Sequence, residues 1–287
     1  MKKTNPKDFP NLRLESSFQE DEIFSSAVEK RGTSLFLGRY TLNQVAAALK
    51  KRNFFKDAKK RKLWPLEFDL DSSEYPLQRF RIFHEKKKPE NMIVDLKIKE
   101  GVFRLKKELT LDFPVSECNF LFLEWLTLQN PLLNFSGEKS PLPGQKRPGL
   151  GLGKKVVDIF IHLARITDKD GIIAFPAYFH NALLFSRYLY FINPEKAGEV
   201  QAIRETFPDV TFKQLAWIVH LDCMRDSEGK KYEWKAEEEV YPLNKKLKRY
   251  FDSKEYRRIV EKSKEHLSFQ IDWECFSKKN KGIMVLD

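Results

Sequence analysis

The first half of the chain alternates between apolar and polar positions in a way that predicts β-strands. Residues 79–83 and 92–98 alternate as half-buried strands do. Gly101 separates them from a third run at 102–105, so the three runs predict an antiparallel meander with one polar face. The segment 120–128 is almost continuously apolar, which is typical of a central strand buried on both faces.

Apolar residues at helical spacing predict helices on both sides of these strands. The expected helices are residues 42–52, with Thr41 as N-cap, and residues 154–166, 181–190, 194–206 and 242–266, the last broken near Asp252. Further short strands are expected at 34–37, 172–175 and 212–223. These elements predict a mixed α/β fold.

The segment between the strand 120–128 and the helix 154–166 carries the strongest chemical signal. Residues 129–148 hold four prolines and two glycines without any period, which predicts a long loop. The loop ends in Gly149-Leu150-Gly151-Leu152-Gly153. A helix start leaves backbone N–H groups unpaired and carries the positive end of the helix dipole, and glycines let a ligand approach the backbone. The sequence therefore predicts an anion site at this turn.

Two common phosphate motifs do not fit the turn. A Walker loop needs four residues between its glycines and a Ser or Thr for magnesium, but Gly149 and Gly153 enclose three residues and Lys155 stands at the magnesium position. A dinucleotide fingerprint needs G-x-G-x-x-G, and its third glycine position is Lys154 here.

The turn and the helices around it resemble the GCN5-related N-acetyltransferase (GNAT) superfamily. The pyrophosphate loop of that superfamily is Gln/Arg-x-x-Gly-x-Gly/Ala, and Gly151 and Gly153 match its two small positions. Residues 181–191 resemble the later helix of the family, with apolar matches at Ala182, Phe185, Leu189 and Phe191. The resemblance covers residues 145–192 and is only topological elsewhere.

The resemblance implies an α+β fold with a central mixed, mostly antiparallel sheet that is flanked by helices and splayed at the cofactor cleft. It implies a lead-in at 1–30, an acyl-CoA-binding domain at 31–240 and a C-terminal helical extension at 241–287. The cofactor would be acetyl-CoA or another acyl-CoA. The residues expected to hold it are Arg147, Gly149, Leu150, Gly151, Leu152, Gly153, Lys154 and Asn181.

The implied reaction is direct attack of an amine on the thioester, without a metal or a covalent intermediate. The acceptor would be a small molecule or a protein with a free amine. Glu124, the one charge in the apolar strand, and His180 are candidate bases. Glu124 is alternatively paired with a neighbouring Lys or Arg, and His180 is alternatively a capping or surface group. Ser186 and Tyr188 are candidates for the acid that protonates the departing thiolate.

Two positions depart from the family pattern and keep another function open. Pro148 occupies the usual Gln/Arg position, and Ser186 stands where a tyrosine proton donor is common. A non-catalytic protein that binds CoA or a nucleotide on the same fold is therefore the main alternative. His220 and Asp222 are expected on one strand face, but without a G-x-S-x-G motif they are interpreted as structural.

Composition adds the compartment and a third hypothesis. The net charge of +11 favours polyanionic partners, and Lys59–Lys62 beside Trp64 resembles a nucleic-acid patch, although a solvated lysine-rich surface explains both. A nucleic-acid partner is therefore the least favoured of the three hypotheses. No apolar run is long enough for a membrane span and no signal segment is evident, which indicates a cytoplasmic protein. Cys118, Cys223 and Cys275 are far apart and are expected to be free thiols.

Overall fold

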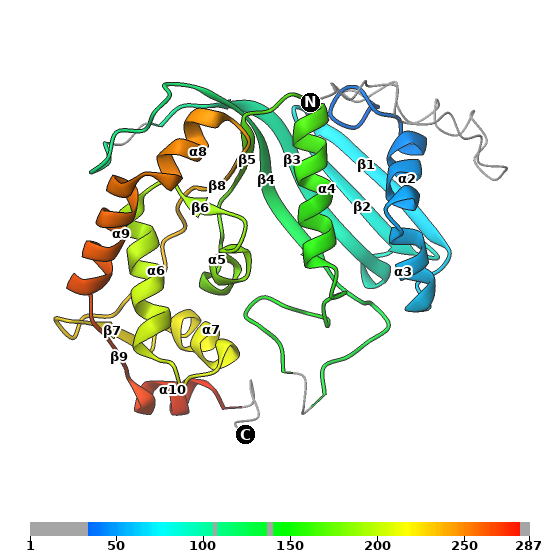
Figure 1. The fold of residues 1–287 in the computed structure, drawn as a ribbon. Coiled ribbons are helices and arrows are strands. Elements are labelled where there is room, and N and C mark those ends of the chain that lie inside the picture. Colours follow the sequence, from blue (N-terminus) through cyan, green and yellow to red (C-terminus); the bar gives the residue numbers. More distant parts are fainter. Residues whose placement is uncertain (1–33, 106–107, 137–139, 282–287) are drawn as a thin grey trace. The chain divides into compact units, whose positions relative to one another are not determined.

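A computed structural model describes residues 34–105, 108–136 and 140–281 and has the predicted mixed α+β architecture (Figure 1). The order of strands in the main sheet is β1-β2-β3-β4-β5-β8-β6, and a second sheet pairs β7 with β9. The chain divides into two compact units, residues 1–101, 121–134 and 149–168, and residues 102–120, 135–148 and 169–287. Strands β1 and β2 belong to the first unit, β5, β8 and β6 belong to the second, and β3 and β4 have residues in both. The predicted lead-in 1–30 lies outside the described residues.

Among its described residues, the first unit contains the antiparallel meander and the helices α2, α3 and α4 (Figure 1). Its elements are α2 (Leu42–Lys51), α3 (Phe54–Lys60), β1 (Leu66–Glu74), β2 (Leu77–His84), the 3-10 turn η2 (Pro89–Asn91), most of β3 (Met92–Phe103), most of β4 (Cys118–Leu128) and α4 (Gly153–Ile166).

Local sequence explains how these elements begin and pair. Thr41 and Gln44 form a capping box at the start of α2, as the N-cap prediction required. Arg79 on β2 donates two hydrogen bonds, of 2.7 and 2.8 Å, to the carboxylate of Asp95 on β3, which is paired with Arg81 and therefore lies diagonally across from Arg79. Because Asp95 is buried, this bidentate pair fixes the register of the two strands.

The second unit contains the rest of the main sheet and the C-terminal helices. Its elements are β5 (Gly171–Ala174), α5 (Phe179–Phe185), β6 (Tyr190–Phe191), α6 (Pro194–Thr206), α7 (Phe212–His220), β7 (Met224–Asp226), β8 (Glu239–Pro242), α8 (Lys245–Asp252), α9 (Lys254–His266), β9 (Phe269–Ile271) and α10 (Trp273–Lys279). Strand β8 lies between β5 and β6 and is antiparallel to both. A hydrophobic core that includes Phe179, Ile203 and Trp217 joins α5, α6 and α7.

Several predicted elements are corrected by the structure. The expected strand 212–223 is the helix α7, which a capping box of Thr211 and Gln214 begins. Leu215–Val219 are all buried, and a run of five consecutive apolar residues is also typical of a short buried strand. The expected third strand 102–105 is not separate: Val102 and Phe103 are the end of β3, which runs through Gly101. Residues 34–37 form a single β-bridge from Phe36 to Tyr40.

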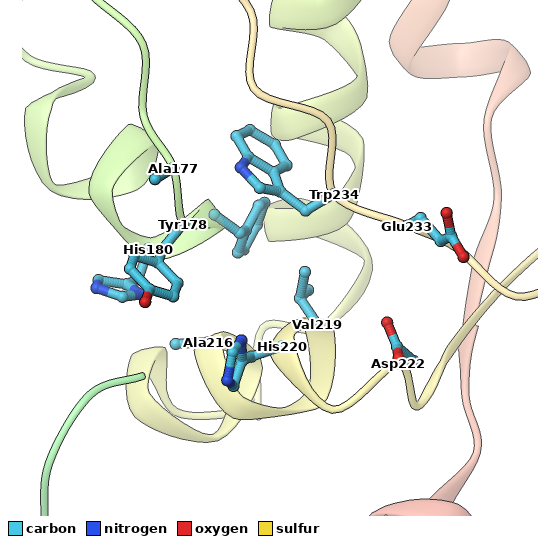
Figure 2. Close-up of a pocket in the computed structure, with 10 residues that line it drawn as sticks. Ala177, Tyr178, His180, Ala216, Val219, His220, Asp222, Glu233 and Trp234 are labelled. Carbon is cyan, nitrogen blue, oxygen red and sulfur yellow. The ribbon is translucent and has the colours of Figure 1, made fainter. Parts of the chain in front are cut away.

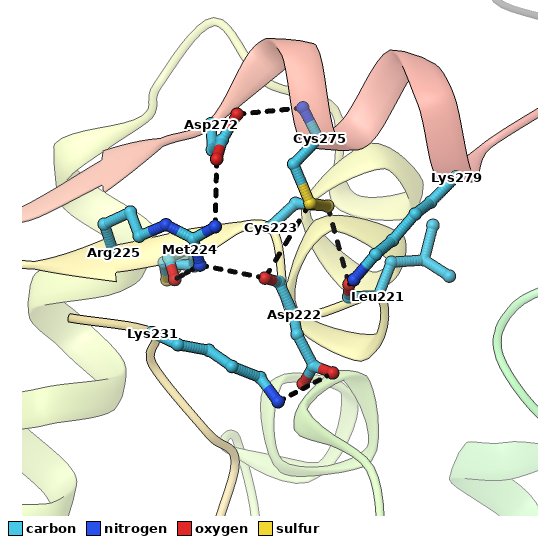
Figure 3. The surroundings of a disulfide bond; sticks show 9 residues. All are labelled: Leu221, Asp222, Cys223, Met224, Arg225, Lys231, Asp272, Cys275 and Lys279. Atoms are coloured by element: carbon cyan, nitrogen blue, oxygen red, sulfur yellow. Dashed lines mark hydrogen bonds and ion pairs between the residues drawn. A yellow bond between two sulfur atoms is a disulfide. The ribbon is translucent and has the colours of Figure 1, made fainter. Parts of the chain in front are cut away.

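The prediction of three free thiols is wrong for two of them. Cys223, just after α7, and Cys275, in α10, form a disulfide bond with their Cα atoms 5.5 Å apart (Figure 3). Arg225 and Asp272 make an ion pair of 2.9 Å beside it, so the same two segments are held twice. Cys118 is a free thiol, as predicted, and it is buried. In the parts of the chain that are described, the helices are all too short or too polar to cross a bilayer.

The contact between α6 and α9 depends on the absence of a side chain at Gly198. A Cβ atom there would lie 2.5 Å from the carbonyl oxygen of Val260 and 2.7 Å from Cβ of Ser263. We expect Gly198→Ala to lower the free energy of unfolding by about 1–3 kcal/mol, although alanine is the better helix former. Gly153→Ala is the matched control, because a Cβ at that helical position meets nothing within 4 Å. Urea denaturation of both variants tests this, and equal midpoints would contradict it.

Candidate functional site

The glycine turn directly follows the end of β4 in space, although twenty residues separate them in sequence. Gln129, the first residue after β4, forms a β-bridge with Gly149. The backbone N–H of Gln129 also donates to the carbonyl of Ile93, and its side chain donates to the carbonyl of Met92. The two ends of the long loop are therefore adjacent. The strand β4, the glycine turn and the helix α4 form a continuous strand-turn-helix arrangement.

The backbone at the start of α4 is open. Leu152 is the N-cap residue, and its side chain makes no capping hydrogen bond. Gly151 has a φ of 67°, a left-handed conformation that favours glycine. Added Cβ atoms at Gly151 and Gly153 would meet nothing within 4 Å. The backbone is therefore uncovered on the Cβ side of both glycines, and the first turn of the helix offers amide donors to an anion.

Basic side chains surround this turn, but most are already engaged. Arg61 on the C-cap of α3 donates to the carbonyl oxygen of Leu150 at 3.1 Å. Lys155 makes an ion pair with Asp57 of α3. Lys154 is exposed and makes no ion pair with any residue that the structure describes. Lys154 is therefore the cation at the turn with the greatest freedom to bind a ligand.

Glu124 is not the buried carboxylate that the apolar strand predicted. It lies on β4 next to the exposed Trp125, and its carboxylate is 2.6 Å from Nζ of Lys99 on β3. The side chain of Glu124 is 32% exposed. The prediction that this strand is buried on both faces is therefore wrong in its second half, and the interpretation of Glu124 as a surface ion pair describes what is found.

His180 is buried in the second unit and lines a pocket of about 360 Å³ (Figure 2). Its ring stacks on Tyr178 with centroids 5.3 Å apart, and Tyr178 also meets the edge of His220 at 5.7 Å. Nδ1 of His180 is buried and has no hydrogen-bond partner among the residues that the structure describes. Burial, followed by the nearby His220, lowers the pKa of His180 to about 4, so the ring is neutral near pH 7.

The remaining predicted residues of this region lie on or beside α5. Asn181 is half-buried in the helix, and its backbone N–H donates to the carbonyl of Tyr178. Ser186 is the C-cap residue, and its hydroxyl donates to the carbonyl of Leu183 at 3.0 Å. Tyr188 is half-buried and follows the helix end. The predicted helix 181–190 is therefore displaced and shorter, and Tyr190 already belongs to β6.

The predicted site residues are divided between the two units. Gly149–Lys154 and Glu124 belong to the first unit, whereas Arg147, His180, Asn181, Ser186 and Tyr188 belong to the second. That they act together stays a prediction. Sequence analysis missed the pocket around His180, because its walls come from residues 177–180, 216–222 and 233–234 and one of these segments had been assigned to a strand.

Glu239 on β8 is a buried titratable residue that sequence analysis missed. Glu239 is 1% exposed, and neither of its carboxyl oxygens has a hydrogen-bond partner in the described part of the chain. Burial raises the pKa of this carboxyl to about 9, so it is protonated near pH 7. Glu239 is opposite Ala174 on β5 and Phe191 on β6, so it lies within the sheet of the second unit.

Comparison with known proteins identifies no relative, because no family model, no curated protein and no solved structure matches the chain.

Proposed function

We propose that this chain binds the diphosphate of an acyl-CoA at the start of α4 and transfers the acyl group to an amine. The observation that carries the proposal is the open, uncapped helix start behind Gly151, placed directly at the end of β4 by the bridge between Gln129 and Gly149. The strand order β1-β2-β3-β4-β5-β8-β6 is consistent with a GNAT-like α+β fold and supports the same proposal.

The geometry of the turn suits a diphosphate for three physical reasons. The amides of the first helical turn are donors without protein acceptors in the described chain, and the helix dipole adds positive potential. The lack of Cβ atoms at Gly151 and Gly153 lets phosphate oxygens approach the backbone. Lys154 supplies an exposed cation beside them, while Arg61 holds the carbonyl of Leu150 and thereby supports the turn.

In the proposed reaction the amine nitrogen attacks the thioester carbonyl carbon. A C–N bond forms, the C–S bond breaks, and the amine proton passes to a base while the CoA thiolate takes up a proton. His180 has the correct neutral state for a base, but its lowered pKa makes it a weak one. The proposal therefore relies mainly on binding and orientation of the two substrates rather than on strong acid–base catalysis.

The substitution Gly153→Asp tests the cofactor site. Aspartate at the first position of α4 is favourable for the helix dipole, so we expect unchanged or higher stability in thermal unfolding. Its negative charge would face the phosphates, so we expect CoA affinity to fall at least about tenfold in calorimetric titration. Gly153→Asn has the same size without the charge and should lose clearly less affinity.

Two results would contradict the cofactor proposal. One is the absence of CoA or acetyl-CoA binding to the wild-type chain at millimolar ligand. The other is equal affinity of the wild type and Gly153→Asp. If CoA binds, thioester hydrolysis and acylation of a panel of polyamines then distinguish an enzyme from a binding protein.

A non-catalytic CoA-binding protein is the second candidate function. It is favoured by the fixed state of two predicted catalytic residues, since Glu124 is paired with Lys99 and the hydroxyl of Ser186 is bound to a backbone carbonyl. In that case CoA would bind with the same dependence on Gly153, and acyl transfer would be absent.

The cytoplasmic location remains a proposal, and the Cys223–Cys275 disulfide weighs against it because disulfides are uncommon in reducing compartments.

A further inference from the structure

The helix α3 and the turn after it lie in the most basic segment of the chain (Figure 1). Residues 50–62 contain eight lysines and arginines against one aspartate, while the formal charge of the whole chain is +11. Lys56, Lys59 and Lys60 follow the i, i+3, i+4 spacing, so they share one face of α3. These three lysines and Lys62 are exposed. Like charges at this spacing repel one another, so a bound polyanion would relieve the repulsion.

The four lysines make no ion pair with any residue in the described part of the chain. Asp57, the acidic residue of α3, is paired with Lys155 of α4. On the neighbouring strand β1, Asp69 is paired with Arg81 and Lys87. The positive charge of these lysines is therefore available to an anion from outside the chain.

An exposed aromatic ring stands beside these charges. Trp64 is 42% exposed, whereas the preceding Leu63 is 1% exposed and anchors the segment in the core. The ring of Phe55 lies 5.6 Å from the indole, and Nζ of Lys59 lies over the indole, 4.3 Å from its centroid. A cation–π contact at an exposed site is weak, so a nucleobase can replace the ammonium on the indole. The freed ammonium can then bind a phosphate. We call Trp64 and the four lysines the α3 patch.

Lys62 occupies a backbone position that favours glycine. Its φ is 61°, a left-handed conformation. Its N–H donates to the carbonyl of Lys59, and the N–H of Leu63 donates to the carbonyl of Ala58. This is the Schellman pattern at a helix end, in which glycine is the usual residue at the position of Lys62. A lysine is less stable than glycine in this conformation, so local stability does not account for its presence.

We propose that the α3 patch binds single-stranded nucleic acid. A base stacks on the indole of Trp64, and Lys59, Lys60 and Lys62 bind the neighbouring phosphates. An exposed aromatic ring favours a single strand, because the bases of a duplex are stacked on one another. A membrane surface fits less well, because it requires a broad apolar face, and Phe55 beside Trp64 is half-buried. The patch lies in the first unit and its proposed ligand needs no CoA.

Fluorescence anisotropy with a labelled strand of twenty thymidines, in the absence of CoA, tests the proposal. We expect saturable binding that weakens about twentyfold between about 50 and 200 mM salt, the effect of about three phosphate contacts on a single strand. Trp64→Ala should weaken binding of this strand about tenfold or more, and binding of a duplex of the same length by less than about twofold. Trp273→Ala is the matched control, because Trp273 is 53% exposed but lies on α10 in the second unit.

The substitution Lys62→Gly separates binding from stability. Glycine relieves the left-handed conformation, so we expect the urea midpoint to rise. Loss of the cation should weaken binding of the thymidine strand about two- to fivefold and reduce its salt dependence. Lys230→Gln is the control for charge alone, because Lys230 is 73% exposed and pairs with Glu228 away from the patch. Its affinity for the strand should equal that of the wild type.

Three results would overturn the proposal. The first is no saturable binding of the thymidine strand at about 50 mM salt up to about 100 μM protein, the weak end of sequence-independent binding. The second is equal affinity of Trp64→Ala and the wild type for that strand. The third is an equal loss of strand and duplex binding in Trp64→Ala. Vesicles of phosphatidylserine that bind the wild type but not Trp64→Ala, together with the second result, would assign the patch to a membrane surface instead.

Discussion

Glu239→Gln is expected to stabilise the folded chain, and by more as the pH rises. Burial raises the pKa of Glu239 from 4.5 to about 9 in the folded state. Between these values the folded chain keeps a proton that the unfolded chain has released, so the free energy of unfolding of the wild type falls with rising pH. The free energy of unfolding that the wild type loses through Glu239 is about 3 kcal/mol at pH 7 and about 6 kcal/mol near pH 9, at about 1.4 kcal/mol per unit of pKa. Glutamine cannot ionise, so the variant keeps this free energy.

Urea denaturation at pH 5, 7 and 8.5 measures the difference between the two proteins. It should be small at pH 5 and widen steadily toward pH 8.5. Glu228→Gln is the control, because Glu228 is exposed and its substitution should leave the pH dependence unchanged. Parallel stability curves for the wild type and Glu239→Gln would show that Glu239 ionises in the folded protein near its ordinary pKa.

The comparison must be made against the wild type because His180 acts in the opposite direction. Its pKa is lowered from 6.5 to about 4 in the folded state. The unfolded chain therefore binds more protons between pH 4 and 6.5, and stability rises with pH in that window. The slopes of His180 and Glu239 cancel between about pH 4.5 and 6.5. In that range the free energy of unfolding of the wild type is expected to change little with pH, although both groups titrate. In Glu239→Gln only the contribution of His180 is left, so the free energy of unfolding should rise with pH.

Sequence predicted elements well where the signal was local and periodic. Thr41 with the helix after it, the strands β2 and β3, and the helix α4 are confirmed. Strand β1 was missed although Leu66, Phe68 and Leu70 alternate with acidic residues, so its signal was present in the sequence. Helix α7 was mistaken for a strand because its five consecutive apolar residues, Leu215–Val219, are equally typical of a short buried strand.

The candidate sites also differ in how local their sequence signal is. The glycine turn is encoded in five consecutive residues, and its open backbone at Gly151 and Gly153 was expected from glycine's lack of a Cβ atom. The pocket around His180 depends on His220 and Trp234, which are remote in sequence and come together only through the packing of α5, α7 and the segment before β8. Burial of Glu239 is likewise a tertiary property, because a carboxylate in a four-residue strand gives no signal that both strand neighbours will cover it.

Reduction of the Cys223–Cys275 disulfide is expected to lower the free energy of unfolding by about 4 kcal/mol. The bond spans 52 residues of sequence, and opening a loop of that length releases the unfolded chain from a large entropic constraint. The substitution Cys275→Ser should have a similar effect. Urea denaturation with and without dithiothreitol measures both. Cys118→Ala is the control, because Cys118 is a free thiol and this variant should respond to the reductant as the wild type does.

The folded chain should nevertheless keep α10 in place after reduction. Strands β7 and β9 pair through three residues each, and Asp272 donates its backbone N–H to the carbonyl of Cys223. Arg225 also donates to the Asp272 carboxylate (Figure 3). These contacts join the same two segments without the sulfur atoms. Trypsin cleavage near Lys278 should therefore be no faster in the reduced protein at low denaturant. Rapid cleavage there would mean that the disulfide secures the C-terminal helix in the folded state, rather than acting on the unfolded chain.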